Sequence, residues 1–211
     1  ENVGMSGNWN KCILLAKVDW VILLHDDDLL ATNAINELSK CRSNSFDIVG
    51  IQLKIFNDGD PLPDIENPEQ LQLKKITIDY NFHFPALAPS GNLYKRDSII
   101  KVGGFPNVIA PDLLLIQLSY WGNVFRINKV LGYYRKGINE STKLSAMEEM
   151  CKLNHYCRIQ TLKKIGIPKW YIHHIILYSD ILFENAFRKE WNDNFRFSMI
   201  PQYNVLQYFI S

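Results

Sequence analysis

Three consecutive carboxylates, Asp26, Asp27 and Asp28, follow directly on an apolar run and His25. Adjacent carboxylates repel one another unless a cation neutralises them or they take up protons. Mg²⁺ and Mn²⁺ prefer oxygen ligands of this kind, shared with the phosphates of a substrate. The cluster therefore predicts a divalent metal site that binds a diphosphate-bearing molecule.

The apolar run before the cluster, Val21 to Leu24, is typical of a strand that is buried on both faces of a parallel sheet. The carboxylates would then lie at the carboxyl end of this strand, which is the edge where open α/β sheets bind ligands. An alternative is that Asp27 or Asp28 caps the helix expected over 32–38, because acids in a first turn favour the helix dipole. A cap accounts for one carboxylate and not for three.

The rest of the sequence predicts helices alternating with strands, followed by a purely helical C-terminal part. Strands or extended segments are expected over 46–56, 75–80, 89–94, 123–127 and 130–134, and helices over 6–17, 31–40, 96–102, 111–122, 144–165 and 170–190. Gly103 and Gly104 end the third of these helices, since glycine permits positive φ. The pattern indicates an α/β fold with a helical appendage.

The composition fits one sizeable hydrophobic core, with 211 residues of which 47% are hydrophobic. The 23 Lys and Arg residues nearly balance the 22 Asp and Glu residues, so no nucleic-acid-binding surface is expected. The cysteines form no CxxC pair, which favours buried thiols in a reducing compartment, and Cys151 with His155 lacks the further ligands of a zinc site. No apolar stretch reaches the roughly 18 residues of a membrane span, so a cytoplasmic protein is expected.

The order of several short motifs resembles that of glycosyltransferase family 2 enzymes, which have the GT-A fold. The motifs are Asn2-Val3-Gly4, Asn10, the strand and acids of 21–28, Gly103-Gly104-Phe105, Pro111-Asp112 and Tyr134-Arg135. The resemblance covers about 1–142 and implies a mostly parallel sheet with flanking helices, and it leaves 143–211 as the helical appendage. The opening strands of the family would precede Glu1, so the resemblance implies an N-terminally truncated copy.

The resemblance also assigns roles around the acid cluster. It implies that Asp26 contacts the ribose of a nucleotide-diphospho-sugar, that Asp27 coordinates Mg²⁺ or Mn²⁺, and that Asp28 supports or shares the metal. Asn10, His25 and Arg135 would contact the nucleotide sugar, because a guanidinium suits phosphate oxygens. Two alternatives stay open, namely that His25 is a strand-end residue held by a hydrogen bond and that Arg135 belongs to a solvated basic turn. Trp9 stands where the family often has an arginine.

On the acceptor side, the resemblance implies that Gly103, Gly104 and Phe105 form the segment that faces the sugar acceptor. Asp112 would be the catalytic base, although Pro111 replaces the glutamate that precedes it in the family. A carboxylate near the acceptor can take the hydroxyl proton as the oxygen attacks the anomeric carbon. The alternative is that Asp112 only caps the helix expected over 111–122.

The resemblance thus implies an inverting glycosyltransferase that moves a sugar to a glycan or lipid-linked acceptor in polysaccharide or glycoconjugate synthesis. One alternative is a non-catalytic remnant or binding module that lacks the nucleotide-base site, and another is a metal-dependent nucleotidyltransferase or phosphohydrolase. A truncated copy could be inactive on its own, and self-association through an unpaired sheet edge is a further expectation. The aromatic residues of the C-terminal part either pack internally or form a peripheral contact with the inner face of a membrane.

Overall fold

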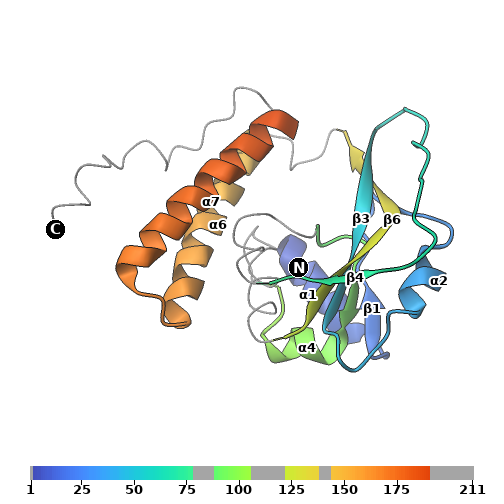
Figure 1. Cartoon of the computed structure of the whole chain (residues 1–211), viewed down its shortest axis with the longest axis horizontal. Coiled ribbons are helices and arrows are strands. Elements are labelled where there is room, and N and C mark those ends of the chain that lie inside the picture. The colour runs from blue at the N-terminus through green and yellow to red at the C-terminus, as the bar shows by residue number, and fades with distance from the viewer. Residues whose placement is uncertain (1, 78–87, 106–121, 138–143, 191–211) are drawn as a thin grey trace.

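A computed structural model describes residues 2–77, 88–105, 122–137 and 144–190 of the chain. These residues form an α/β part around one mixed sheet and a pair of long helices beside it (Figure 1). The mixed α/β class agrees with the expectation from the sequence. The helix expected over 111–122, which includes Asp112, lies outside the described residues.

The sheet has its strands in the order β1-β5-β3-β6-β2, and β4 pairs with β6 on another stretch of that strand. The strands are β1 (Trp20–Ile22), β2 (Leu29–Leu30), β3 (Ile48–Asn57), β4 (Leu73–Lys75), β5 (Leu93–Lys95) and β6 (Val124–Lys136). The long pair β3–β6 is parallel, and the other pairings are antiparallel. A parallel sheet is therefore present only in this central pair.

Two expectations about strands were wrong. The run before the acids forms only the short strand β1, which is half-buried and pairs antiparallel with β5, so it is not a strand buried inside a parallel sheet. The segments 123–127 and 130–134 were expected as two strands, whereas β6 continues through both. The pairing register between β6 and β3 shifts on either side of Gln52. These shifts accommodate the irregularity, so β6 continues as one strand.

Successive residues of a strand point to opposite faces of the sheet, so apolar side chains lie on both faces. Helices cover both of these faces. On β3, Ile48 packs in one core cluster and Val49 in the other. The first cluster includes residues of α1 (Gly4–Leu15) and α4 (Arg96–Lys101), and the second includes residues of α2 (Ala34–Ser39). The described α/β part is therefore a sheet between two helical layers.

The end of α4 is fixed by the glycine pair that the sequence suggested. The N–H of Gly103 donates to the carbonyl of Ile100 at 3.0 Å, and the N–H of Gly104 donates to the carbonyl of Ile99 at 2.9 Å. Both glycines have positive φ, 94° and 76°. This is the Schellman pattern of helix termination, which turns the chain sharply after α4 and directs Phe105 into the core.

A buried ion pair ties α2 to β6. The ammonium of Lys129 lies 2.9 Å from a carboxylate oxygen of Glu37, and Lys40 lies 2.6 Å from the other oxygen. These hydrogen bonds, first from Lys40 and then from Lys129, lower the pKa of Glu37 below its usual value. The charged carboxylate is thus favoured by the folded state.

We expect the stability that Glu37 contributes to be present above the ordinary carboxyl pKa and to be lost as the pH falls through its lower folded pKa. Glu37→Gln should therefore lower the melting temperature at neutral pH, and the difference from the wild type should shrink as the solution is acidified. Thermal melts over the acid range measure this. The expectation is contradicted if the difference is the same at all pH values.

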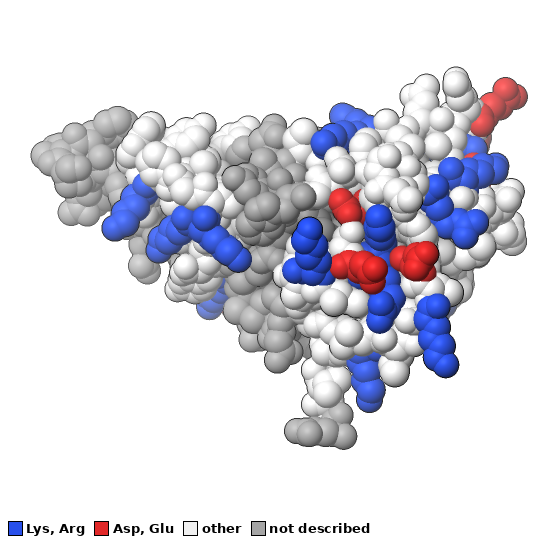
Figure 2. All heavy atoms as spheres, turned by 90° about the horizontal axis from the view of Figure 1, so that it is seen from below, with Lys and Arg blue, Asp and Glu red and all other residues white. Residues whose placement is uncertain are grey.

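The helical pair consists of α6 (Leu144–Lys164) and α7 (Lys169–Glu190), and both helices match the expected ranges closely. An apolar cluster of Leu162, Ile172 and Ile176 joins them near the turn, whereas His155 and Asp180 form a buried pair at 2.7 Å. On the face shown in Figure 2, Lys and Arg side chains lie on the helical pair, and the acidic side chains in view lie over the sheet. None of the described helices is long and apolar enough to cross a membrane.

Candidate functional site

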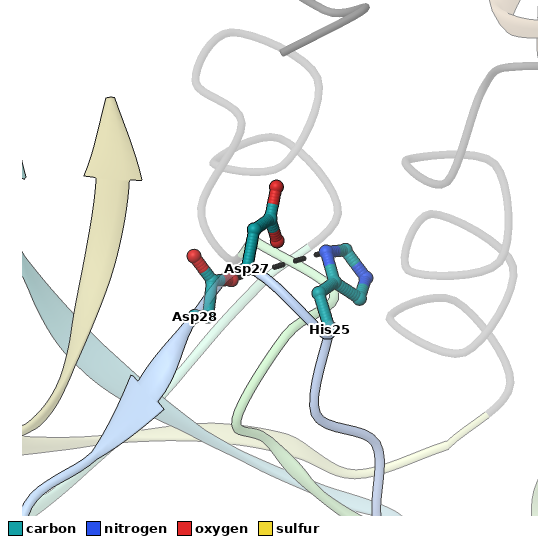
Figure 3. Close-up of side chains that lie close together, drawn as sticks. All are labelled: His25, Asp27 and Asp28. Atoms are coloured by element: carbon teal, nitrogen blue, oxygen red, sulfur yellow. Dashed lines mark ion pairs between the residues drawn. The ribbon is translucent and has the colours of Figure 1, made fainter. Parts of the chain in front are cut away.

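The structure brings His25, Asp27 and Asp28 together just after β1 (Figure 3). One potential ligand atom from each of these three side chains lies within 4.8 Å of the others. The Nδ1 atom of His25 is 3.9 Å from Oδ2 of Asp28, which is too long for a hydrogen bond. Among the described residues, this is the only group of three or more His, Cys, Asp or Glu side chains close enough to share one ion.

Asp28 is held in place from two sides. Its side chain is fully buried, and its Oδ1 atom accepts a hydrogen bond of 3.1 Å from the backbone N–H of Arg135 at the end of β6. The hydroxyl of Ser90 also bonds to this carboxylate. The helix that follows begins at Ala34 with Asn33 as its N-cap, so the alternative in which Asp27 or Asp28 caps it was wrong.

The guanidinium of Arg135 lies beside the acid cluster, as its place in the sequence suggested. Its Nε atom donates to the backbone carbonyl of Asp27 at 3.0 Å, and one terminal nitrogen pairs with Asp58 at 2.6 Å. The guanidinium also lies over the ring of Phe56, 5.2 Å from its centre. Arg135 is therefore fixed against the loop that carries Asp27 and Asp28.

Ser90 reaches the cluster because the chain makes a close turn before β5. The N–H of Gly91 donates to the carbonyl of Leu23 at 2.6 Å, and φ at Gly91 is 80°. A Cβ at this position would lie 2.6 Å from a side-chain carbon of Ile51, so only glycine fits without a shift. The hydroxyl of the preceding Ser90 then accepts a hydrogen bond of 3.2 Å from the N–H of His25.

The surroundings of the cluster disfavour the charged forms of Asp28 and His25. Burial raises the pKa of Asp28 above its ordinary value, and the neighbouring Asp27 raises it further. Burial lowers the pKa of His25 despite the three nearby carboxylates. A cation bound among these side chains would favour the ionised Asp28 carboxylate and the neutral imidazole, which are the forms that bind a metal.

The residues of this cluster fit a divalent cation. The Oδ2 atom of Asp28 and the Nε2 atom of His25 are buried and lack a hydrogen-bond partner among the described residues. A buried carboxylate oxygen without a partner is costly, and a metal ion is one way to satisfy it. Carboxylate oxygens suit Mg²⁺ and Mn²⁺, and a neutral imidazole adds a nitrogen donor that Mn²⁺ tolerates better than Mg²⁺ does.

Aromatic stacking links the acid cluster to the predicted acceptor segment. The ring of His25 stacks on Trp9 of α1, with ring centres 4.9 Å apart and planes 10° apart. Trp9 meets Phe105 edge to face at 5.1 Å, and Phe105 meets Tyr94 of β5 in the same manner at 5.9 Å. The position of the imidazole is therefore coupled to the segment that follows α4.

Asn10 holds this segment in place. Its side-chain nitrogen donates to the carbonyl of Phe105 at 2.7 Å, and its side-chain oxygen accepts from the N–H of Phe105 at 2.8 Å. A Cβ on Gly104 would lie 2.5 Å from that same oxygen, which explains why glycine stands there. Asn10 thus positions the acceptor segment in the structure, and its contact with a nucleotide sugar stays a prediction.

We expect Asn10→Ala to lower the stability of the chain by about 1–3 kcal/mol, because it removes both partners of the Phe105 backbone. Asn10→Asp should also lower the stability, because it keeps the acceptor for the Phe105 N–H but loses the donor to the Phe105 carbonyl. Urea unfolding of the variants measures this, with the exposed Asn36→Ala as the matched control. Equal stability of Asn10→Ala and the control contradicts the bridging role.

Asp26 and Asp112 are the remaining predicted site residues. Asp26 is exposed at the tip of the same loop, outside the group of three ligand atoms. Asp112 lies outside the described residues, so its predicted role as catalytic base stays a prediction. Sequence reasoning missed the contribution of Ser90 and Asp58, which only the folded chain brings near the acids.

Comparisons with known proteins relate the chain to others through its fold. The sequence matches no known family profile, and no curated protein matches it. The structure is similar to the crystal structure of S. aureus TarS 1–349, a glycosyltransferase, with a TM-score of 0.53 and 14% sequence identity. The similarity covers 89% of this chain and 54% of that chain.

The fold is glycosyltransferase-like. The chain spans about half the length of the TarS structure that it matches, 54%. At 14% identity the likeness concerns the fold alone. It agrees with the resemblance in the sequence at the level of a glycosyltransferase-like α/β fold, whereas membership of glycosyltransferase family 2 stays a prediction.

Proposed function

We propose that this chain is the catalytic part of a nucleotide-sugar-dependent glycosyltransferase that uses Mg²⁺ or Mn²⁺. The observation that carries the proposal is the buried carboxylate of Asp28, with an unpartnered oxygen facing His25 and Asp27, in a glycosyltransferase-like fold. The glycosyltransferase-like fold supports transfer of a glycosyl group at the coarse level. The metal, the donor and the residue roles are our proposal.

Asp27, Asp28 and His25 would hold the cation, and Asp26 would contact the ribose of the donor. When bound, the cation stabilises the negative charge that develops on the nucleoside diphosphate as the sugar departs. Asp26 suits a ribose contact because it is exposed on the same loop, next to the residues that face the ion. Arg135, anchored on the backbone of Asp27, keeps this loop in register with the end of β6.

The sugar acceptor would lie on the side of Gly103, Gly104 and Phe105, where Asn10 and the Trp9 ring fix the backbone. Asp112 would remove the proton from the attacking hydroxyl as the bond to the anomeric carbon forms. The acceptor that we propose is a glycan or a lipid-linked glycan, and inversion is the stereochemical outcome that the family resemblance implies.

A donor-turnover assay tests the proposal. The chain is incubated with a panel of UDP-sugars and GDP-sugars in Mn²⁺, and the nucleotide products are separated by chromatography. We expect release of a nucleoside diphosphate that stops when the metal is chelated. A glycosyl transfer or slow donor hydrolysis leaves the diphosphate intact, because the bond that breaks joins the sugar carbon to the phosphate oxygen.

The products also separate the alternatives. Release of a nucleoside monophosphate indicates cleavage within the diphosphate and supports a phosphohydrolase or nucleotidyltransferase instead. Binding of Mn²⁺ and UDP or GDP without any turnover supports a binding module. Absence of both binding and turnover contradicts the proposed function.

A further inference from the structure

The turn between α6 and α7 presents basic and aromatic side chains that the proposed transfer does not use. Lys163 and Lys164 end α6, Lys169 begins α7, and Trp170 and Tyr171 follow directly. All five side chains are exposed, and Trp170 is exposed to 69%. We call these five residues the basic-aromatic tip.

The backbone under the basic-aromatic tip is well defined. The N–H of Gly166 donates to the carbonyl of Lys163 at 3.1 Å, and the N–H of Ile167 donates to the carbonyl of Leu162 at 3.0 Å. With φ of 83° at Gly166, this is a Schellman motif. Leu162 and Ile167 pack with Ile172, which is the apolar contact that accompanies such a turn. The tip is thus presented on a packed helical hairpin.

The charge around the tip has one sign. Residues 150–179 include no Asp or Glu, and four of their five Lys and Arg residues are exposed, whereas Arg158 is buried. The next acid along the chain, Asp180, is buried and paired with His155 at 2.7 Å. Figure 2 agrees, since the side chains coloured on the helical pair in that view are basic. The tip therefore presents a positive surface.

The aromatic side chains add a second kind of contact. Trp170 and Tyr171 lie next to each other, with ring centres 5.4 Å apart. Contiguous exposed apolar patches with polar residues around them mark interaction sites, whereas single exposed rings do not. Trp and Tyr prefer the interface between lipid head groups and hydrocarbon, because one part of each ring system is polar and the rest is apolar.

We propose that the basic-aromatic tip docks the chain on the surface of a bilayer that contains anionic phospholipid. The three lysines meet the negative head groups, and the two aromatic rings insert at head-group depth. An acidic protein would match the lysines, whereas lipid also accounts for adjacent Trp and Tyr side chains on a protruding turn. The inference does not depend on the proposed transferase activity.

Vesicle flotation of the 211-residue chain tests the proposal. Vesicles of phosphatidylcholine with phosphatidylglycerol should bind the chain, and vesicles of phosphatidylcholine alone should bind it far more weakly. Replacing Lys163, Lys164 and Lys169 together by Gln should weaken the partition by about 10²-fold, from roughly 1 kcal/mol for each basic residue near an anionic surface. The matched control replaces the exposed Lys11, Lys17 and Lys101 by Gln, which removes the same charge from the sheet part.

The aromatic contribution has its own control and its own signal. Trp170→Ala should weaken vesicle binding, whereas Leu15→Ala should not, although both side chains are 69% exposed. Tryptophan fluorescence should shift to the blue on binding, and Trp170→Phe should remove most of that shift. About 0.5 M NaCl should weaken the interaction, because salt screens exposed charges.

Three results overturn the proposal. The first is equal binding to neutral and anionic vesicles, and the second is equal binding of the tip variant and the sheet-part control. The third is binding to soluble polyglutamate but not to anionic vesicles, which assigns the surface to an acidic protein. Circular dichroism confirms that each variant is folded, and the single variant Lys164→Gln repeats the test should the triple variant not fold.

Discussion

Replacing Asp27 or Asp28 by asparagine should reduce the metal-dependent release of nucleoside diphosphate by at least about 10²-fold. Loss of a residue that only orients a metal ligand typically lowers metal affinity or activity by about 10–100-fold. The carboxylates of Asp27 and Asp28 would be ligands themselves. The structure supports this because both side chains face His25 within one group of ligand atoms. Initial rates with Mn²⁺ and the donor that the wild type prefers measure the effect.

The fold of the Asp28 variant can be checked independently. Because burial raises the pKa of Asp28, its contribution to stability is largest below the ordinary carboxyl pKa and falls as the pH rises through the folded pKa. Asp28→Asn without metal should therefore be at least as stable as the wild type at neutral pH. Asp19→Asn, an exposed carboxylate just before β1, is the matched control and should keep full activity. Equal rates in Asp28→Asn and Asp19→Asn contradict the metal site.

Asp112→Asn should leave donor binding intact and lower sugar transfer by about 10²-fold or more, which is the usual effect of losing a general base. Donor hydrolysis should fall less, because water can lose its proton to solvent. Transfer is measured with an acceptor from a panel of mono- and disaccharides that the wild type uses.

The alternative role of Asp112, a helix cap, has a matched control in this chain. Asp97 lies in the first turn of α4 and is exposed there. Asp97→Asn tests what the loss of a first-turn acid does to the protein, and it should leave transfer unchanged. Transfer by Asp112→Asn within about tenfold of the wild type indicates that Asp112 only caps a helix.

Local patterns allowed the helices among the described residues to be predicted, because helix signals lie within a few residues of one another. The glycine pair after α4 and Gly166 after α6 mark helix ends, and both have the positive φ that such ends require. The direction of β5 could not be predicted in this way. It depends on pairing with β1 and β3, which come from distant parts of the sequence.

The candidate site could also be predicted only in part from the sequence. The three adjacent acids and the later Arg135 can be found in the sequence, and the structure brings Arg135 beside them. The stacking of Trp9 on His25 and the bridge from Asn10 to Phe105 could not be found there. Both contacts depend on how α1 lies against the sheet and against the segment after α4, which tertiary packing decides.

Electron paramagnetic resonance of Mn²⁺ tests the central claim most directly. Free Mn²⁺ gives a sharp six-line signal, which broadens when the ion is bound to the protein. We expect the chain to remove the signal of one ion per molecule, with higher affinity in the presence of UDP or GDP, and the double variant Asp27→Asn/Asp28→Asn to remove none. A signal unchanged by the wild-type chain, or lost equally with the double variant, contradicts a cation site at His25, Asp27 and Asp28.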